Sequence, residues 1–291
     1  MSCAFSRLKA ELQTFFVFIP CLFALIFSGQ AAAQRLAVIV PEKTPPNEKF
    51  VEILAESLAS KLIVLDDSLS ETAFRSADVK DAFNMTATEA KRVAAAIGCD
   101  YFLIVRTGAL RRSSFAKPEY YEAFNVVYLV SARTGRLAFW DLRSFEAGTA
   151  ADAEKLLLRS AESLASDIAG KIGTITKNDM SEKLAGSIEQ VPEIDAQSKT
   201  FRPPLPYKRI KPEYTRIAYL YDARATVDIS VDIDENGVIL RTEIVRWAGF
   251  GLDKAVIDAV GKMNWRPAER SGKTLPMRVL LRYNFTKIEK E

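Results

Sequence analysis

The residues with the clearest capacity for chemistry form a calcium-loop pattern near the C-terminal end of the chain. Asp232, Asp234, Asn236, Gly237 and Glu243 follow the spacing of an EF-hand loop, in which carboxylate and amide oxygens bind Ca²⁺. An EF-hand also needs a helix on each side, whereas both flanks of this pattern alternate apolar and polar residues as strands do. We therefore expect a β-hairpin here, with a looser Ca²⁺ site at its turn as the alternative.

The chain contains no histidine, and this excludes several classes of catalytic site. A Ser-His-Asp triad, a Cys-His dyad and a histidine-containing zinc site are all ruled out. The three cysteines, Cys3, Cys21 and Cys99, are too few for a four-cysteine metal site, and Cys99 follows a run of small apolar residues that predicts burial. We expect no catalytic residue, metal or cofactor, so an enzyme is the weakest of the function classes considered.

The composition is that of a globular protein. The 291 residues are 48% hydrophobic and 26% charged, which argues against both a disordered chain and a protein with many membrane spans. The length suggests two domains. The net charge of +3 is too small to indicate nucleic-acid binding, and we expect none.

The first 33 residues have the three parts of an export signal. Arg7 and Lys9 precede an apolar run over residues 15–27, and small residues follow at positions 31–33. The run is shorter than the roughly 17–25 residues that a membrane-spanning helix needs. We expect residues 1–33 to be a signal peptide that is cleaved between Ala33 and Gln34. The alternative is an uncleaved inner-membrane anchor over residues 14–29.

Short apolar runs and amphipathic segments alternate in the first domain, residues 35–175. Strands are expected over residues 35–40, 61–67, 101–105, 123–130 and 137–140, and helices over 47–62, 87–97 and 150–172. This order predicts an α/β sandwich with five strands. Residues 96–105, Ala-Ile-Gly-Cys-Asp-Tyr-Phe-Leu-Ile-Val, and the turn Ser131-Ala-Arg-Thr-Gly-Arg-Leu137 resemble envelope domains of the CsgG and TolB N-terminal type. That resemblance implies a role in protein contacts or assembly in the periplasm.

A linker is expected over residues 176–202, because large apolar residues are few there and no periodicity is sustained. Residues 203–291 then form the second domain. Alternation at period two predicts strands over 223–233 and 238–247 around an Asn-Gly turn, a helix follows from 252 to 263, and a last strand is expected over 275–285. The order β-β-α-β predicts a three-stranded antiparallel sheet with one face covered by the helix. The fold class is therefore α+β with two domains.

The second domain resembles the TonB C-terminal domain over residues 203–287. The resemblance rests on Arg209-Ile-Lys-Pro-Glu-Tyr214, on the hairpin at 231–238, on Gly251-Leu-Asp-Lys-Ala255, and on Trp265-Arg-Pro-Ala268 before Gly272-Lys-Thr-Leu-Pro276. It implies a non-catalytic periplasmic protein that binds an extended segment of an outer-membrane receptor, or of another envelope protein, in support of transmembrane transport. The partner segment adds a strand to the sheet.

Three features depart from that family's pattern. Thr215 follows Tyr214 where the family has proline, and the chain lacks the family's anchor histidine and long proline-rich linker. Contact with inner-membrane motor proteins is therefore expected only if the N-terminus stays uncleaved. The alternative function is a structural or assembly scaffold of the cell envelope with no transport role.

The last strand is the expected binding edge, with its odd-numbered side chains facing the helix. Its even-numbered side chains then face away from the helix and are available to a partner. The residues expected to contact the partner are Arg209, Tyr214, Arg278, Leu280, Arg282 and Asn284. Because Arg278 is expected to be exposed, its replacement by glutamate is predicted to change stability by no more than about 0.5 kcal/mol.

Overall fold

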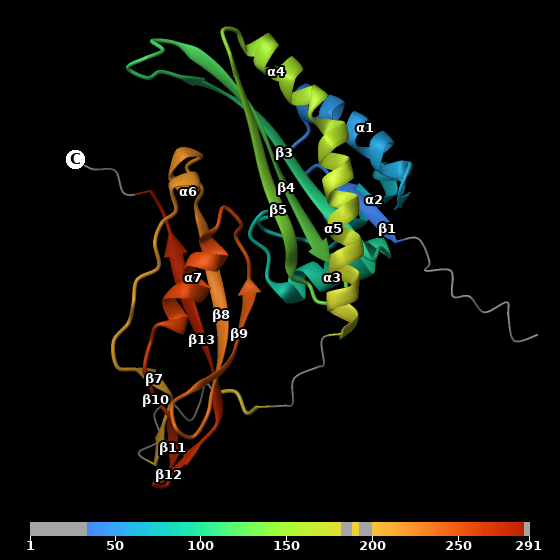
Figure 1. Ribbon diagram of the computed structural model, residues 1–291. Coiled ribbons are helices and arrows are strands. Elements are labelled where there is room, and N and C mark those ends of the chain that lie inside the picture. Colours follow the sequence, from blue (N-terminus) through green and yellow to red (C-terminus); the bar gives the residue numbers. More distant parts are fainter. Residues whose placement is uncertain (1–33, 182–187, 192–199, 288–291) are drawn as a thin grey trace, which may run out of the picture. The chain divides into compact units, whose positions relative to one another are not determined.

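The computed structural model describes residues 34–181, 188–191 and 200–287 (Figure 1). The expected signal peptide, the alternative anchor over residues 14–29 and most of the expected linker lie outside these residues. Within the described part of the chain, no helix has the length and apolar character needed to cross a membrane.

A five-stranded sheet forms the first domain, as the sequence predicts. Its strands are β1 (Arg35–Ile39), β2 (Ile63–Val64), β3 (Tyr101–Arg112), β4 (Tyr120–Ser131) and β5 (Leu137–Ala147), in the order β2-β1-β3-β4-β5. β1 pairs in parallel with β2 and β3, and the remaining pairs are antiparallel. Most of β4 is buried, because both faces of the sheet are covered by helices.

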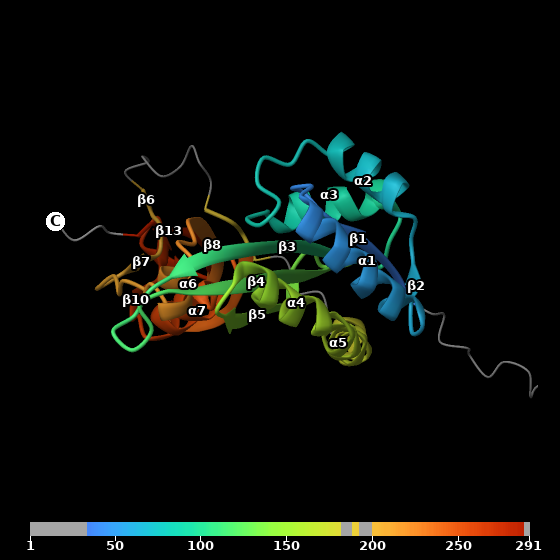
Figure 2. The ribbon, with the colours of Figure 1, turned by 90° about the horizontal axis from the view of Figure 1, so that it is seen from above.

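The helices lie in two layers (Figure 2). One face of the sheet packs against α1 (Pro45–Ala59), α4 (Ala150–Arg159) and α5 (Ala161–Ser181), with Phe50, Leu103 and Leu164 fully buried between them. The other face packs against α3 (Ala87–Ile97), next to α2 (Asp67–Ser76), around Phe102, Ile104 and Tyr128. The two layers explain why β1, β3 and β4 read as nearly continuous apolar runs.

Three predictions about this domain are corrected. The helix expected over residues 150–172 is two helices, which meet at Ser160, whose hydroxyl donates to the Leu157 carbonyl at 2.6 Å. α5 then continues to Ser181, so the expected linker begins inside a helix. The strand expected over residues 61–67 ends at Val64, because Asp66 caps α2 by accepting the Leu69 amide at 2.9 Å.

The second domain has the predicted three-stranded antiparallel sheet. Its strands are β8 (Ala225–Ile233), β9 (Ile239–Arg246) and β13 (Met277–Phe285), in the order β13-β8-β9. The odd-numbered residues of β8 from Val227 to Ile233 are buried in the same apolar cluster as α7 (Leu252–Gly261), and so are Leu281 and Phe285 of β13. The predicted phase of the strands is therefore confirmed.

Short elements that the sequence patterns do not reveal complete this domain. They are β6 (Phe201–Arg202), β7 (Leu205–Pro206), α6 (Arg216–Leu220), β10 (Trp265–Arg266), β11 (Ala268–Arg270) and β12 (Lys273–Leu275). The last strand expected over residues 275–285 is split at Pro276, which has no amide hydrogen to donate. β12 before the proline pairs with β11, and β13 after it pairs with β8.

Candidate partner-binding site

The three-stranded sheet leaves two strands, β9 and β13, at its edges. The end of β9 is covered by residues of the first domain, through an antiparallel bridge between Thr86 and Arg246. Beside it, the Trp247 amide donates to the Met85 carbonyl at 3.2 Å. These contacts close one end of the β9 edge to an added strand.

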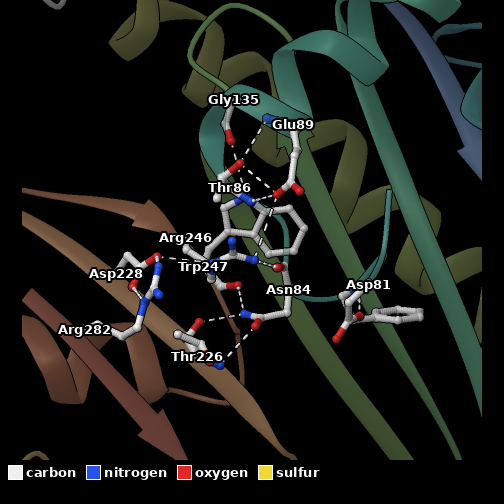
Figure 3. A network of polar contacts seen from close by, with 11 residues as sticks. Asp81, Asn84, Thr86, Glu89, Gly135, Thr226, Asp228, Arg246, Trp247 and Arg282 are labelled. Carbon is white, nitrogen blue, oxygen red and sulfur yellow. Dashed lines mark hydrogen bonds and ion pairs between the residues drawn. The ribbon is translucent and has the colours of Figure 1, made fainter. Parts of the chain in front are cut away.

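Asn84 holds the two domains together through every polar atom of its side chain (Figure 3). Its amide nitrogen donates to the carbonyls of Thr226 and Trp247 at 2.8 and 2.7 Å, and its amide oxygen accepts the Thr226 backbone amide at 3.0 Å. The Asn84 carbonyl accepts from Arg246 at 2.8 Å. Because these contacts join backbone groups at the ends of β8 and β9, Asn84 fixes the sheet against the loop before α3.

Trp247 extends this contact into the core of the first domain. Its side chain is 1% exposed, lies beside the ring of Tyr128, and donates from Nε1 to the Gly135 carbonyl at 3.2 Å. The Tyr128 hydroxyl donates in turn to the Ala248 carbonyl at 3.0 Å. A tryptophan of the second domain is thus buried in the first, so the β9 side of the sheet belongs to the interface between them.

The β13 edge has a different environment. The Arg278 amide donates to the Glu189 carbonyl at 2.8 Å, and the Arg278 carbonyl accepts the Val191 amide at 3.1 Å. Both backbone groups of Arg278 therefore point away from β8. Successive residues of an antiparallel pair alternate in this direction, so the backbone groups of Leu280, Arg282 and Asn284 also point outward. Within the described residues, no backbone group bonds to these three.

Two of the three arginines expected to contact a partner, Arg278 and Arg282, form ion pairs within the sheet. Arg278 makes a two-pronged ion pair with Asp232 at 2.6 and 2.8 Å, and Arg282 makes another with Asp228 at 2.7 and 3.0 Å. Both carboxylates are almost fully buried. The guanidinium groups of the two arginines donate to these carboxylates. A partner strand at this edge would therefore contact the backbone and the aliphatic part of the arginine side chains rather than unpaired charges.

The prediction that Arg278 tolerates glutamate is corrected, because Arg278 is half-buried over Asp232. Arg278→Glu places a second carboxylate against a buried one, and we expect it to lower the free energy of unfolding by about 3 kcal/mol. Lys273→Glu, the same charge reversal at an exposed position, is the matched control and is expected to stay within about 0.5 kcal/mol. Urea denaturation of the two variants measures both values, and equal losses would contradict the role given to Asp232.

Leu280 and Asn284 complete the outer row of β13. Leu280 is 48% exposed, and it is the one large apolar residue of β13 with so exposed a side chain. Asn284 is exposed, and its amide oxygen accepts the Thr226 hydroxyl at 2.9 Å. Leu280 is therefore the even-numbered side chain of β13 that offers apolar surface next to the outward backbone groups.

Tyr214 and Asn284 lie together in a pocket of about 300 Å³ at the C-terminal end of β13. Half of the residues that line the pocket are aromatic, among them Tyr219, Tyr283 and Phe285. The Tyr214 hydroxyl lies 3.1 Å from the Ala218 carbonyl and 2.9 Å from the Ala223 carbonyl, which holds its ring beside Phe285. Sequence reasoning missed Tyr219 and Tyr283, although the density of tyrosines between residues 214 and 221 was a visible signal.

Arg209 acts on this pocket through its charge. Burial raises the pKa of Tyr283, and the positive charge of Arg209 opposes that rise. Arg209 itself is exposed. Of the six residues expected to contact a partner, five therefore belong to β13 or to the pocket at its end, and the sixth, Arg209, acts electrostatically on the pocket.

The calcium-loop pattern does not gather its side chains around one point. Asp232 bonds to Arg278, and Glu243 pairs with Arg136 and Arg241. Asp234 accepts the amides of Val238 and Asn236 at 2.7 and 2.9 Å, and these bonds lower its pKa. Among the described residues no group of three acidic or cysteine side chains is placed to hold a metal ion.

Calcium is therefore expected to leave the stability of the protein unchanged. The hairpin already uses its carboxylates in internal bonds, so binding of Ca²⁺ requires breaking them. Thermal unfolding in millimolar Ca²⁺ is expected to give the same Tm as in millimolar Mg²⁺. A Tm that rises with Ca²⁺ but not with Mg²⁺ would support the alternative, a looser Ca²⁺ site at the turn.

Cys99 is buried, as its small apolar neighbours predict. It is 6% exposed, and burial raises the pKa of its thiol to about 12. A thiol with so high a pKa is protonated at neutral pH and is a poor nucleophile. Cys99 is therefore a packing residue.

Comparison with known proteins finds one family in the second domain. Residues 210–286 match the family described as Gram-negative bacterial TonB protein C-terminal. This match supports the resemblance drawn from the sequence for that region. No curated protein matches the chain.

Solved structures similar to parts of the chain are distant. They include lipoprotein GNA1162 from Neisseria meningitidis, 15% identical, which covers 47% of this chain and 99% of that one with a TM-score of 0.33. The hypothetical protein CT253 from Chlamydia trachomatis is 10% identical, with coverages of 49% and 99% and a TM-score of 0.35. The LpoB C-terminal domain from Salmonella enterica is 19% identical, with coverages of 40% and 86% and a TM-score of 0.26. Similarities with such low TM-scores establish neither a shared fold nor a shared function. The resemblance of the first domain to the CsgG and TolB type is therefore not confirmed.

Proposed function

We propose that the chain is a non-catalytic protein of the bacterial cell envelope. It docks an extended segment of an outer-membrane receptor, or of another envelope partner, by strand addition in support of transmembrane transport. The observation that carries the proposal is the stretch of β13 in a TonB-like domain where the backbone groups of Leu280, Arg282 and Asn284 point outward and have no backbone partner among the described residues. Its expected location is the periplasm, reached by export and cleavage between Ala33 and Gln34.

Strand addition suits this edge for a physical reason. Each outward residue offers one amide hydrogen and one carbonyl oxygen, so an extended segment satisfies its own backbone while pairing with β13. Main-chain bonds supply affinity with little dependence on sequence, and side-chain pockets beside the edge supply specificity. One end of β9 is covered by the first domain, whereas three outward residues of β13 have no backbone partner among the described residues, so the proposal places the added strand on β13.

The aromatic pocket at the end of β13 is the second part of the proposed site. Asn284 belongs both to the outward row of the strand and to the pocket lining, so a segment paired with β13 runs toward the pocket. Tyr214, Tyr219 and Phe285 offer ring surface with a polar rim, which favours an apolar side chain of the partner. Arg209 and Lys211 at or near the pocket favour an acidic neighbour in the same segment.

Titration of the exported chain, residues 34–291, with synthetic peptides tests the proposal. The peptides cover the extended N-terminal segments of outer-membrane receptors of the source bacterium, and each has a matched version with proline at alternate positions. Binding by a parent peptide that is lost with its proline version supports strand addition. Failure of every peptide to bind, or binding that the prolines leave unchanged, contradicts it and favours the scaffold without a transport role.

N-terminal sequencing of the protein from the envelope fraction tests the proposed location. A chain that begins at Gln34 is expected. An intact N-terminus would instead support the anchored form and contact with motor proteins of the inner membrane.

A further inference from the structure

Residues 188–191 of the chain already lie on the β13 edge. Gln190 forms a parallel bridge with Arg278, in which the Glu189 carbonyl accepts the Arg278 amide at 2.8 Å and the Val191 amide donates to the Arg278 carbonyl at 3.1 Å. The segment thus makes the pair of backbone bonds that an added parallel strand makes.

Two further contacts fix this segment in place. The Glu189 carboxylate forms an ion pair with Arg270 at 2.7 Å. Val191 packs against the small apolar cluster of Phe201, Ala268 and Met277. Backbone bonds, a charge pair and an apolar contact therefore agree on one position for the segment.

We propose that residues 188–191 are an intramolecular strand that competes with the partner strand for the Arg278 end of the β13 edge. The competition rests on the proposed function, whereas the position of the strand rests on the contacts above. The Arg278 amide has one hydrogen to donate, so the Glu189 carbonyl and a partner carbonyl cannot both accept it in the same way. A partner strand therefore ends beside Leu280 or displaces the segment.

The segment is suited to displacement because little of it is buried. Glu189 and Gln190 are exposed, and Val191 is only half-buried. Its ion pair with Arg270 is solvent-exposed, and such pairs contribute little stability. The two bonds to Arg278 are then the main contacts that a partner has to replace, and it replaces them with two of its own.

Amide hydrogen exchange in the full exported chain tests the position of the strand without any partner. The amides of Leu280, Arg282 and Asn284 point outward and are expected to exchange quickly, whereas that of Leu281 bonds to β8 and is expected to exchange slowly. The Arg278 amide also points outward, but it donates to the Glu189 carbonyl. It is therefore expected to exchange at least about tenfold more slowly than the Leu280 amide. Equal rates for Arg278 and Leu280 overturn the proposal.

A matched pair of proline variants tests the competition. Val191→Pro removes the amide that donates to Arg278, whereas Gln190→Pro removes an amide that points away from β13. Val191→Pro is expected to speed exchange of the Arg278 amide about tenfold and to tighten binding of a receptor-segment peptide about tenfold. Gln190→Pro is expected to leave both close to the parent values.

The outcomes separate this proposal from the proposed function. Tighter binding by Val191→Pro alone supports the competition. Equal binding by the parent and both variants overturns the competition and leaves strand addition intact. If no receptor peptide binds any of the three proteins while the Arg278 amide is protected in the parent and exchanges faster in Val191→Pro, the proposed function fails and the intramolecular strand is supported as a structural element alone.

Discussion

Substitution of Leu280 by proline is expected to abolish partner binding, with a loss of affinity of about 100-fold or more, while the domain stays folded. The Leu280 amide points away from β8, so its loss removes no bond within the sheet. It does remove the central donor of the open stretch and leaves a partner carbonyl unpaired beside a proline ring. Peptide titration measures the affinity, and circular dichroism measures the fold.

Two neighbouring substitutions control this prediction. Leu280→Ala keeps the amide and removes the exposed side chain, so most of the binding is expected to remain. Leu281→Pro removes an amide that bonds to β8 opposite Ile229, and it is expected to destabilise the domain by about 3 kcal/mol or more. A folded Leu280→Pro variant that binds a receptor peptide as tightly as the parent would refute strand addition at this edge.

Substitution of Trp247 by alanine is expected to lower the free energy of unfolding by about 3–5 kcal/mol. The side chain is 1% exposed, packs in the core around Tyr128 and donates to the Gly135 carbonyl. Its removal leaves a cavity between the two domains and an unpaired carbonyl. Urea denaturation followed by far-ultraviolet circular dichroism measures the loss.

The conservative variant Trp247→Phe separates the contribution of the hydrogen bond to Gly135 from that of the packed aromatic ring. It keeps an aromatic ring but loses the donor to Gly135, and we expect a loss of about 1–2 kcal/mol. The alanine variant is also expected to uncouple the unfolding of the two domains, which gives two transitions instead of one. A loss below 1 kcal/mol with a single transition would show that this contact does not hold the β9 side of the sheet.

Local patterns in the sequence determined the three long strands and the helix α7 of the second domain. Alternation at period two predicts the faces of β8 and β13, because successive side chains of a strand point to opposite sides. The Asn236-Gly237 turn predicts the connection of β8 to β9, since glycine at position 237 adopts a φ of 83° that other residues rarely adopt. These signals depend only on neighbouring residues, and the structure agrees with them.

The same alternation could not reveal the state of the polar face. Arg278 and Arg282 are polar residues at exposed-looking positions, yet their partners Asp232 and Asp228 are buried across the neighbouring strand. Whether a charged side chain is free or paired depends on the register between β13 and β8, because the paired residues are 46 and 54 positions apart in the sequence. Sequence alone therefore identified β13 correctly but could not reveal that Arg278 and Arg282 are paired with buried carboxylates.

Only the tertiary structure decided which backbone groups at the two edges of the sheet already have partners among the described residues. The contact of Arg246 with Asn84 joins residues 162 positions apart, and it belongs to the interface that covers the end of β9. The bonds of Glu189 and Val191 to Arg278 likewise cover one end of β13, and no other described residue bonds to the outward backbone groups from Leu280 onward. Backbone groups look the same in every sequence, so their pairing depends on which distant segment packs beside them.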